Sequence, residues 1–118
     1  MLIIVGGMNY QTDFREVMLN PIKLNIENKL IYSGHLYQFT WGPELLWKCF
    51  SEQYFRERIF NEQLSIRAVD GGVPFLMGEF GNNQRDTYWI YLMRYMKELD
   101  LDWTYWCLDG YKCDDQED

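Results

Sequence analysis

Histidine and cysteine, the residues that most often bind transition metals, are scarce in this chain. It has one histidine, His35, and three cysteines, none of them in a C-x-x-C pair. A structural zinc site takes four Cys or His ligands at close spacing, so we expect no metal site, and no motif indicates a cofactor. An odd cysteine count leaves at least one thiol free unless it pairs outside the chain. Cys107 and Cys113 could lie near each other, and both redox states stay open.

Long hydrophobic runs and positive charge are also lacking. No apolar run approaches the roughly 20 residues of a membrane span, so we expect no transmembrane segment. The chain has 11 basic against 18 acidic residues, with a net charge of −7. An acidic surface argues against nucleic acid or an anionic membrane as partner. The first residues, 1–7, form a very short apolar stretch without a basic residue, so we expect a strand there and not a signal peptide.

Apolar and aromatic residues, by contrast, are plentiful. They make up 47% and 18% of the 118 residues, enough for one small domain with its own core. We place that domain at residues 1–112. Residues 113–118 are mostly acidic and are expected to form a disordered tail.

Strand-like and helix-like segments alternate along the chain. The strand-like runs are short and rich in aliphatic or aromatic residues, and they lie at 2–5, 29–32, 73–77 and 101–108. The helix-like segments follow an apolar spacing of three to four residues, and they lie at 13–20, 43–63 and 86–99. Pro21 ends the first of them, and Asp86 is expected to cap the last. Alternation of this kind is typical of a parallel α/β sheet. A complete (β/α) barrel has eight such units, so four units predict a small open sheet or half of a barrel.

The segment 73–81, VPFLMGEFG, is the most informative part of the sequence. An apolar run typical of a strand buried on both faces leads to Glu79, and Gly81 follows. In (β/α) barrels the active site lies at the carboxyl ends of the strands. Glu79 is therefore either a catalytic carboxylate or a residue that only closes a strand and points to solvent.

Residues able to act in chemistry follow each of the other strand-like runs. They are Asn9 and Tyr10 after the first run, His35, Tyr37 and Trp41 after the second, and Trp106 at the end of the fourth. Parallel strands would bring all of them to one rim. His35 and Tyr37 are two residues apart, so in an extended segment they share a face. A single histidine is more often structural than catalytic, and an aromatic residue in a strand is more often part of a core.

Four segments together resemble the carboxyl-terminal half of the glycoside hydrolase family 5 barrel, the cellulase or endoglucanase family. They are 2–10 (LIIVGGMNY), 34–41 (GHLYQFTW), 73–81 (VPFLMGEFG) and 101–106 (LDWTYW). The resemblance implies an α/β fold made of strands five to eight of a (β/α)8 TIM barrel with their helices, and thus a fragment. It also implies a retaining glycosidase that acts on a β-linked polysaccharide or oligosaccharide.

The same resemblance implies roles for individual residues. Glu79 would be the catalytic nucleophile, Tyr37 would orient it, and His35 would lie near the acid/base and the substrate. Trp106 would form the floor of the subsite that holds the distorted sugar. Asn9, Tyr10 and Trp41 are weaker candidates for substrate contact.

One half of the family's site is absent from the sequence. A retaining glycosidase needs two carboxyl groups about 5 to 5.5 Å apart. The family's acid/base Glu lies in an Asn-Glu-Pro motif after the fourth strand, and this chain has no such motif, since Asn61-Glu62 is followed by Gln63. We expect that half of the barrel to precede Met1, and secretion, usual in the family, to be directed from there.

Two other interpretations remain open beside the hydrolase fragment. The chain could be a catalytically inactive remnant that still binds carbohydrate through its aromatic side chains. Alternatively, it could be a small open α/β binding domain unrelated to sugars. The missing acid/base favours the first of these over an active enzyme, and the ordered set of rim residues argues against the second.

Overall fold

The computed structural model describes residues 1–41, 49–64, 73–82 and 85–107. Its centre is a parallel sheet in the order β1–β2–β3–β4, in which each strand pairs with the next one along the chain. The strands are β1 (Ile3–Gly6), β2 (Leu30–Tyr37), β3 (Phe75–Gly81) and β4 (Asp102–Tyr105). The predicted parallel α/β sheet is thereby confirmed, with four strands in sequential order.

Helices occupy the connections between the strands. They are α1 (Met8–Gln11), α2 (Arg15–Leu19), the 3-10 helix η1 (Gln38–Trp41), α4 (Glu52–Tyr54), the π-helical segment η2 (Phe55–Gln63) and α5 (Thr87–Glu98). The helix predicted at 86–99 is present as α5, and Asp86 caps it as expected. The Asp86 carboxylate accepts a hydrogen bond from the N–H of Trp89 at 3.0 Å. A side chain that accepts an N–H of the first turn is the usual device that begins a helix.

The helix expected at 43–63 is interrupted at Cys49 and Phe50. Its first residues, 43–48, lie outside the described residues, and Cys49 and Phe50 are not helical. The described helix begins after Ser51, whose hydroxyl accepts the N–H of Tyr54 at 3.2 Å. Apolar spacing continues across this point, with the Phe50 ring stacked on Tyr54 at 4.4 Å. The periodicity therefore concealed an N-cap inside the expected helix.

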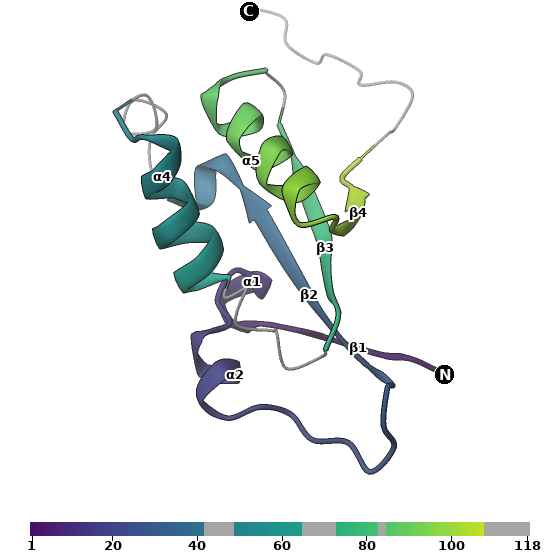
Figure 1. Ribbon diagram of the computed structural model, residues 1–118. Coiled ribbons are helices and arrows are strands. Elements are labelled where there is room, and N and C mark those ends of the chain that lie inside the picture. Colours follow the sequence, from purple (N-terminus) through teal and green to yellow (C-terminus); the bar gives the residue numbers. More distant parts are fainter. Residues whose placement is uncertain (42–48, 65–72, 83–84, 108–118) are drawn as a thin grey trace, which may run out of the picture.

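One face of the sheet packs against α5 and η2, which lie along the same side of β2 and β3 (Figure 1). Side chains alternate along a strand, and every second residue of β2 from Leu30 to Leu36 faces this core. The fully buried residues with the largest side chains are Phe14, Leu36, Phe55, Phe60, Leu64, Met77, Tyr88, Leu92 and Tyr95. The core thus fixes which residues of β2 face the opposite way, namely Ile31, Ser33, His35 and Tyr37.

Ion pairs outside this core join α4 and η2 to α5. Arg56 donates to Glu52 at 3.0 Å and to Glu98 of α5 at 2.6 Å, while Arg94 of α5 donates to Glu52 at 2.9 Å. Exposed pairs contribute little singly, but a shared network also fixes the orientation of the helices. The η2 and α5 segments are held together on the side of the sheet away from His35 and Tyr37.

The ends of the strands differ from the prediction in two places. β2 does not stop at Tyr32 but continues through Gly34 to Tyr37, so His35 and Tyr37 lie within the strand. Gly34 lies inside the strand, and a Cβ at this position would collide with the ring of Phe75. The fourth strand ends at Tyr105, whereas the prediction extended it to Leu108, which lies outside the described residues together with the acidic tail 113–118.

Candidate functional site

A β-bulge near the carboxyl end of the sheet determines where the Glu79 side chain points. Gly34 of β2 pairs with Met77 of β3, but the next residue, His35, pairs with Glu79, so Gly78 is the extra residue. Strict alternation from Met77, which faces the helices, would also turn residue 79 toward the helices. One inserted residue reverses that direction and brings Glu79 to the face of His35 and Tyr37. Bulges next to active sites often redirect a side chain in this way.

Glycine is required at the bulge because the backbone passes close to its neighbours. A Cβ on Gly78 would collide with the Ser33 hydroxyl and lie 3.4 Å from Nε2 of His35. On the other side, the Thr104 hydroxyl of β4 donates a hydrogen bond to the carbonyl of Gly78. Gly78, Ser33 and Thr104 therefore position Glu79. None of the three was predicted from the sequence, although a glycine inside a strand pattern is a recognised sign of a bulge.

Glu79 lies against two side chains of β2. The Tyr37 hydroxyl donates a hydrogen bond to Oε2 of Glu79 at 3.1 Å, and Nδ1 of His35 lies 3.5 Å from the same oxygen. The side chains of His35 and Glu79 are 18% and 35% exposed. Glu79 is thus fixed by neighbours yet accessible from solvent, which is the condition for a carboxylate that acts on a bound molecule.

The Tyr37 hydroxyl is held in its protonated form. Burial is the largest cause, and the hydrogen bond to Glu79 and the negative charge of that carboxylate add to it, so the pKa of Tyr37 rises to about 12. Tyr37 therefore remains a hydrogen-bond donor to Glu79 throughout the neutral range. Behind it, the buried hydroxyl of Tyr88 donates to the carbonyl of Leu36 at 2.9 Å, which anchors β2 next to Tyr37.

This geometry predicts a specific titration of Tyr37. In NMR spectra of the chain with 13C-labelled tyrosine, Tyr37 is expected to ionise near pH 12. Glu79→Gln should lower that pKa but leave it above the usual value of 10.0, since burial remains. Because folding favours the protonated hydroxyl, its contribution to stability is complete below pH 10 and is lost as the pH rises through about 12.

Tyr88 is the internal control for this titration. Burial raises the pKa of Tyr88 well above the usual value, and Glu79 is not among the causes. The charge of ionised Tyr37 is a minor cause, so Glu79→Gln should leave the Tyr88 signal unchanged at every pH below the ionisation of Tyr37. If Tyr37 ionised near 10, or if its pKa did not respond to Glu79→Gln, the contact between the two side chains would be refuted.

Trp106 lies at the same end of the sheet, directly after β4. Its backbone N–H donates to the carbonyl of Phe80 at 3.0 Å, and a Cβ on Gly81 would collide with the carbonyl of Trp106. Trp106 is 60% exposed. Trp103 and Tyr105 instead pack edge-on against Phe80, which faces the helices. Trp106 itself follows β4 at a bend, beside the carboxyl end of β3.

The other expected contact residues are not joined to this cluster. Asn9 and Tyr10 follow β1 in α1, both have positive φ, and Tyr10 is 95% exposed. The structure places them after the strand most distant from β4, and no described hydrogen bond connects them with Glu79. Trp41 ends η1, and its side chain lies outside the part of the structure that is described.

Asn61 and Glu62 lie in η2, on the helical side of the sheet. Oδ1 of Asn61 accepts a hydrogen bond from the Tyr95 hydroxyl at 2.5 Å, and Glu62 pairs with Arg58 at 2.8 Å. Both residues thus stabilise helix contacts, in agreement with the expectation that they do not replace an Asn-Glu-Pro motif.

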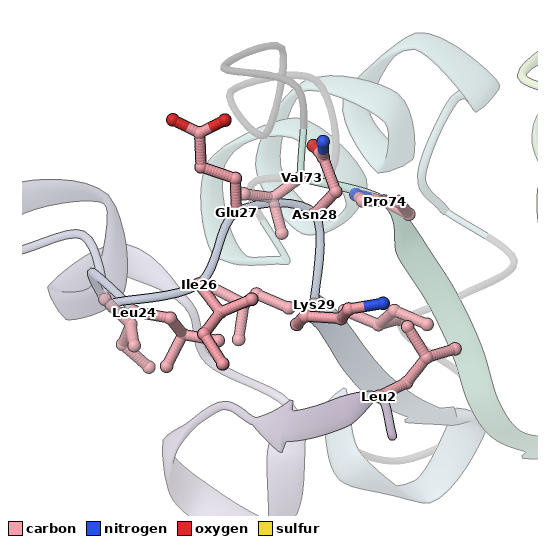
Figure 2. Close-up of a pocket in the computed structure, with 11 residues that line it drawn as sticks. Leu2, Leu24, Ile26, Glu27, Asn28, Lys29, Val73 and Pro74 are labelled. Atoms are coloured by element: carbon pink, nitrogen blue, oxygen red, sulfur yellow. The ribbon is translucent and has the colours of Figure 1, made fainter.

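Two hollows lie away from Glu79. One, of about 500 Å³, is at the amino ends of β2 and β3, where Figure 2 shows Leu2, Leu24, Ile26, Val73 and Pro74 around it. The other, of about 650 Å³, is a mostly aromatic and aliphatic groove on the helical side of β4, and its lining includes Phe80, Trp89, Met93, Trp103 and Tyr105. Since (β/α) barrels act at the carboxyl ends of their strands, neither is the candidate active site.

Two further observations on the described ranges concern groups of metal-ligating side chains and helices of membrane-spanning length. No three His, Cys, Asp or Glu side chains there are grouped so that they could hold a metal ion. Likewise, no helix in the described part of the chain is long and apolar enough to cross a membrane.

The comparison with protein-family models decides the family. The model described as cellulase, glycosyl hydrolase family 5, matches residues 1–112. The chain belongs to glycosyl hydrolase family 5. A family 5 protein from Chamaecyparis obtusa is 29% identical over 126 aligned positions, which cover 98% of this chain and 23% of that protein.

Solved structures agree with this family 5 assignment at the level of the fold. A β-glucanase from Saccharophagus degradans, crystallised in complex with cellotetraose, superposes with a TM-score of 0.72 at 20% identity. The match covers 94% of this chain and 34% of the β-glucanase. A cellulase–inhibitor complex gives a TM-score of 0.69 at 24% identity and is covered to 36%.

These matches show how much of the length of a family 5 protein the chain covers. It spans about a quarter of the curated relative and about a third of the solved chains. The prediction of a partial (β/α) barrel is therefore confirmed. Membership in a glycosidase family also argues against a small α/β domain unrelated to sugars.

Proposed function

We propose that this chain carries the nucleophile side of a retaining β-glycosidase site, with Glu79 as the nucleophile. The hydrogen bond from Tyr37 to Oε2 of Glu79, at 3.1 Å, is the observation that carries the proposal. A nucleophilic carboxylate must be ionised and aimed at the anomeric carbon. Tyr37 keeps its proton because its pKa is raised to about 12, so it remains a donor that holds the carboxylate in place.

The proposed reaction has two steps. An oxygen of Glu79 attacks the anomeric carbon while the bond from that carbon to the leaving oxygen breaks, and the electron pair goes to the leaving oxygen. A glycosyl ester of Glu79 results. Water then attacks the same carbon, loses a proton and releases Glu79 as a carboxylate, so the configuration is retained. His35 lies beside Glu79 and would contact the substrate, and Trp106 would stack against a sugar ring.

The proton for the leaving oxygen must come from a second carboxyl group. By family resemblance that group is the Glu of an Asn-Glu-Pro motif, which is absent from these 118 residues. We therefore propose that the chain works together with a further part of the barrel, which would supply the acid/base. For the substrate we propose a β-linked glucan, since a structural relative binds cellotetraose and is a β-glucanase.

The proposal is tested by completing the barrel. The test protein is a chimaera. It joins this chain to the part of the Saccharophagus degradans β-glucanase that the chain does not cover. We expect the chimaera to hydrolyse cellotetraose with retention of configuration, as seen by NMR of the first-formed product. A folded chimaera that released the inverted anomer would contradict the two-step mechanism.

The absence of an Asn-Glu-Pro motif from these 118 residues favours a second function. In that case the chain would bind β-linked oligosaccharide through exposed aromatic side chains such as Trp106 and have no catalytic role. A folded chimaera without hydrolytic activity, together with cellotetraose binding that Trp106→Ala weakens, would support this function over catalysis.

A further inference from the structure

An exposed aromatic ring, that of Phe39, lies beside the Tyr37–Glu79 pair. Phe39 belongs to η1, directly after β2, and is 79% exposed. Its ring stacks on the ring of Tyr37, with the centroids 5.2 Å apart and the planes 16° from parallel. No sequence pattern singled out this residue.

The packing of the core does not account for Phe39. It is absent from the buried cluster and from the partly buried residues around that cluster. A single exposed apolar residue is common on protein surfaces, so exposure alone carries no argument. What distinguishes Phe39 is its fixed orientation, because it stacks on Tyr37, and Tyr37 in turn is hydrogen-bonded to Glu79. Two contacts thus define the plane of the Phe39 ring relative to Glu79.

The strand order gives this ring a definite place along the rim. Phe39 follows β2, Glu79 is on β3 and Trp106 follows β4, and β3 lies between the other two strands. An extended ligand that crosses the carboxyl ends of these strands would pass Trp106, Glu79 and Phe39 in turn. Two exposed aromatic residues, Phe39 and Trp106, therefore follow the strands on either side of the one that carries Glu79.

We propose that Phe39 is a stacking platform for one glucosyl unit of a β-linked glucan, on the β2 side of Glu79. This inference rests on the proposed function. In a β-linked glucosyl unit the ring hydroxyls are equatorial, so axial C–H groups form flat apolar faces that pack on the negative face of an aromatic ring. Phe39 presents such a ring without a polar group, which favours stacking over hydrogen bonding.

Binding of cellotetraose to the 118-residue chain, followed by NMR titration, tests the platform. Phe39→Ala is expected to raise the Kd about three- to tenfold, the range that aromatic contacts usually contribute. Phe39→Trp should keep the Kd within about twofold, because the platform remains. Phe39→Ala should also lower the pKa of Tyr37 in the free chain, since it removes part of the burial that raises this pKa.

Tyr54→Ala is a matched control. Tyr54 is also exposed and stacks on a neighbouring ring, that of Phe50, with planes 21° from parallel, but it lies in α4 on the helical side. Tyr54→Ala should leave the Kd for cellotetraose unchanged. Chemical shifts far from the site should show that each variant is folded. An equal loss in both alanine variants would overturn the platform.

The remaining outcomes separate the platform from the proposed function. If Phe39→Ala bound cellotetraose like the unchanged chain while Trp106→Ala bound it more weakly, the platform would be wrong and the proposed function would stand. If cellotetraose caused no shift changes around Glu79 at millimolar concentration, both the platform and the proposed substrate would be refuted.

Discussion

Glu79→Gln in the chimaera is expected to lower kcat for cellotetraose by on the order of 10⁴-fold or more, a typical loss when a catalytic nucleophile is removed. The amide is nearly isosteric with the carboxylate and can keep the hydrogen bond from Tyr37. It cannot form the glycosyl ester, however, so neither the formation nor the hydrolysis of this intermediate can occur. Steady-state hydrolysis of cellotetraose measures the effect, and KM should change far less than kcat because sugar-binding side chains remain.

Glu27→Gln is the matched control for this change. Glu27 is an exposed carboxylate that lines the hollow at the amino ends of β2 and β3, away from Tyr37. Its substitution removes the same charge and should leave kcat unchanged. A Glu79→Gln chimaera that retained a tenth or more of the activity would contradict the assignment of the nucleophile.

Azide provides a stereochemical check on the same assignment. In Glu79→Ala, azide can enter the space of the lost carboxylate and attack the anomeric carbon from that side. The product should be the α-glycosyl azide, formed with inversion. If Glu79 were instead the acid/base, azide would attack the glycosyl ester from the opposite side and give the β-azide.

The isolated chain should depend strongly on the leaving group of its substrate. Without a general acid, the leaving oxygen must depart unprotonated, and such assistance is worth roughly 10²–10⁴-fold. Dinitrophenolate departs without a proton, so dinitrophenyl cellobioside should react with the chain in a burst of one equivalent. Phenyl cellobioside needs the proton, and the chain should turn it over roughly 10²–10⁴-fold more slowly than the chimaera.

The leaving-group series separates a missing acid from a misfolded site. A misfolded site would react slowly with both substrates, whereas a missing acid affects mainly phenyl cellobioside. Hydrolysis of phenyl cellobioside by the isolated chain at the rate of the chimaera would show that an acid is present in these 118 residues and would contradict our account. The series therefore tests the division of the site between two parts of the barrel.

Local sequence patterns predicted the sheet because its determinants are local. Apolar runs marked the strands, and the Asp86 cap and the apolar stripe of α5 marked a helix. The helix expected at 43–63 was wrong in its continuity, since Ser51 begins a helix inside that range by accepting a hydrogen bond from Tyr54. Periodicity alone does not reveal a cap when apolar residues such as Phe50 continue the pattern on its other side.

The arrangement of the candidate site depended on a non-local feature. The common face of His35 and Tyr37 follows from a two-residue spacing within one strand and was predicted. The side on which Glu79 lies depends on the register between β2 and β3, where Gly78 is inserted. That register arises from contacts of Gly78 with Ser33 and Thr104, which are distant in sequence. Phe39 was missed for the same reason, because its stacking on Tyr37 is visible only in three dimensions.

Covalent labelling of the isolated chain tests the central claim, that Glu79 is the nucleophile, most directly. The reagent is dinitrophenyl 2-deoxy-2-fluoro-β-cellobioside, whose leaving group needs no acid and whose fluorine slows release of the glycosyl ester. Mass spectrometry of the intact chain and of its proteolytic peptides should find one fluorocellobiosyl group, attached to Glu79 and absent in Glu79→Gln. Attachment to a different carboxylate, or no labelling of the folded chain, would contradict the claim.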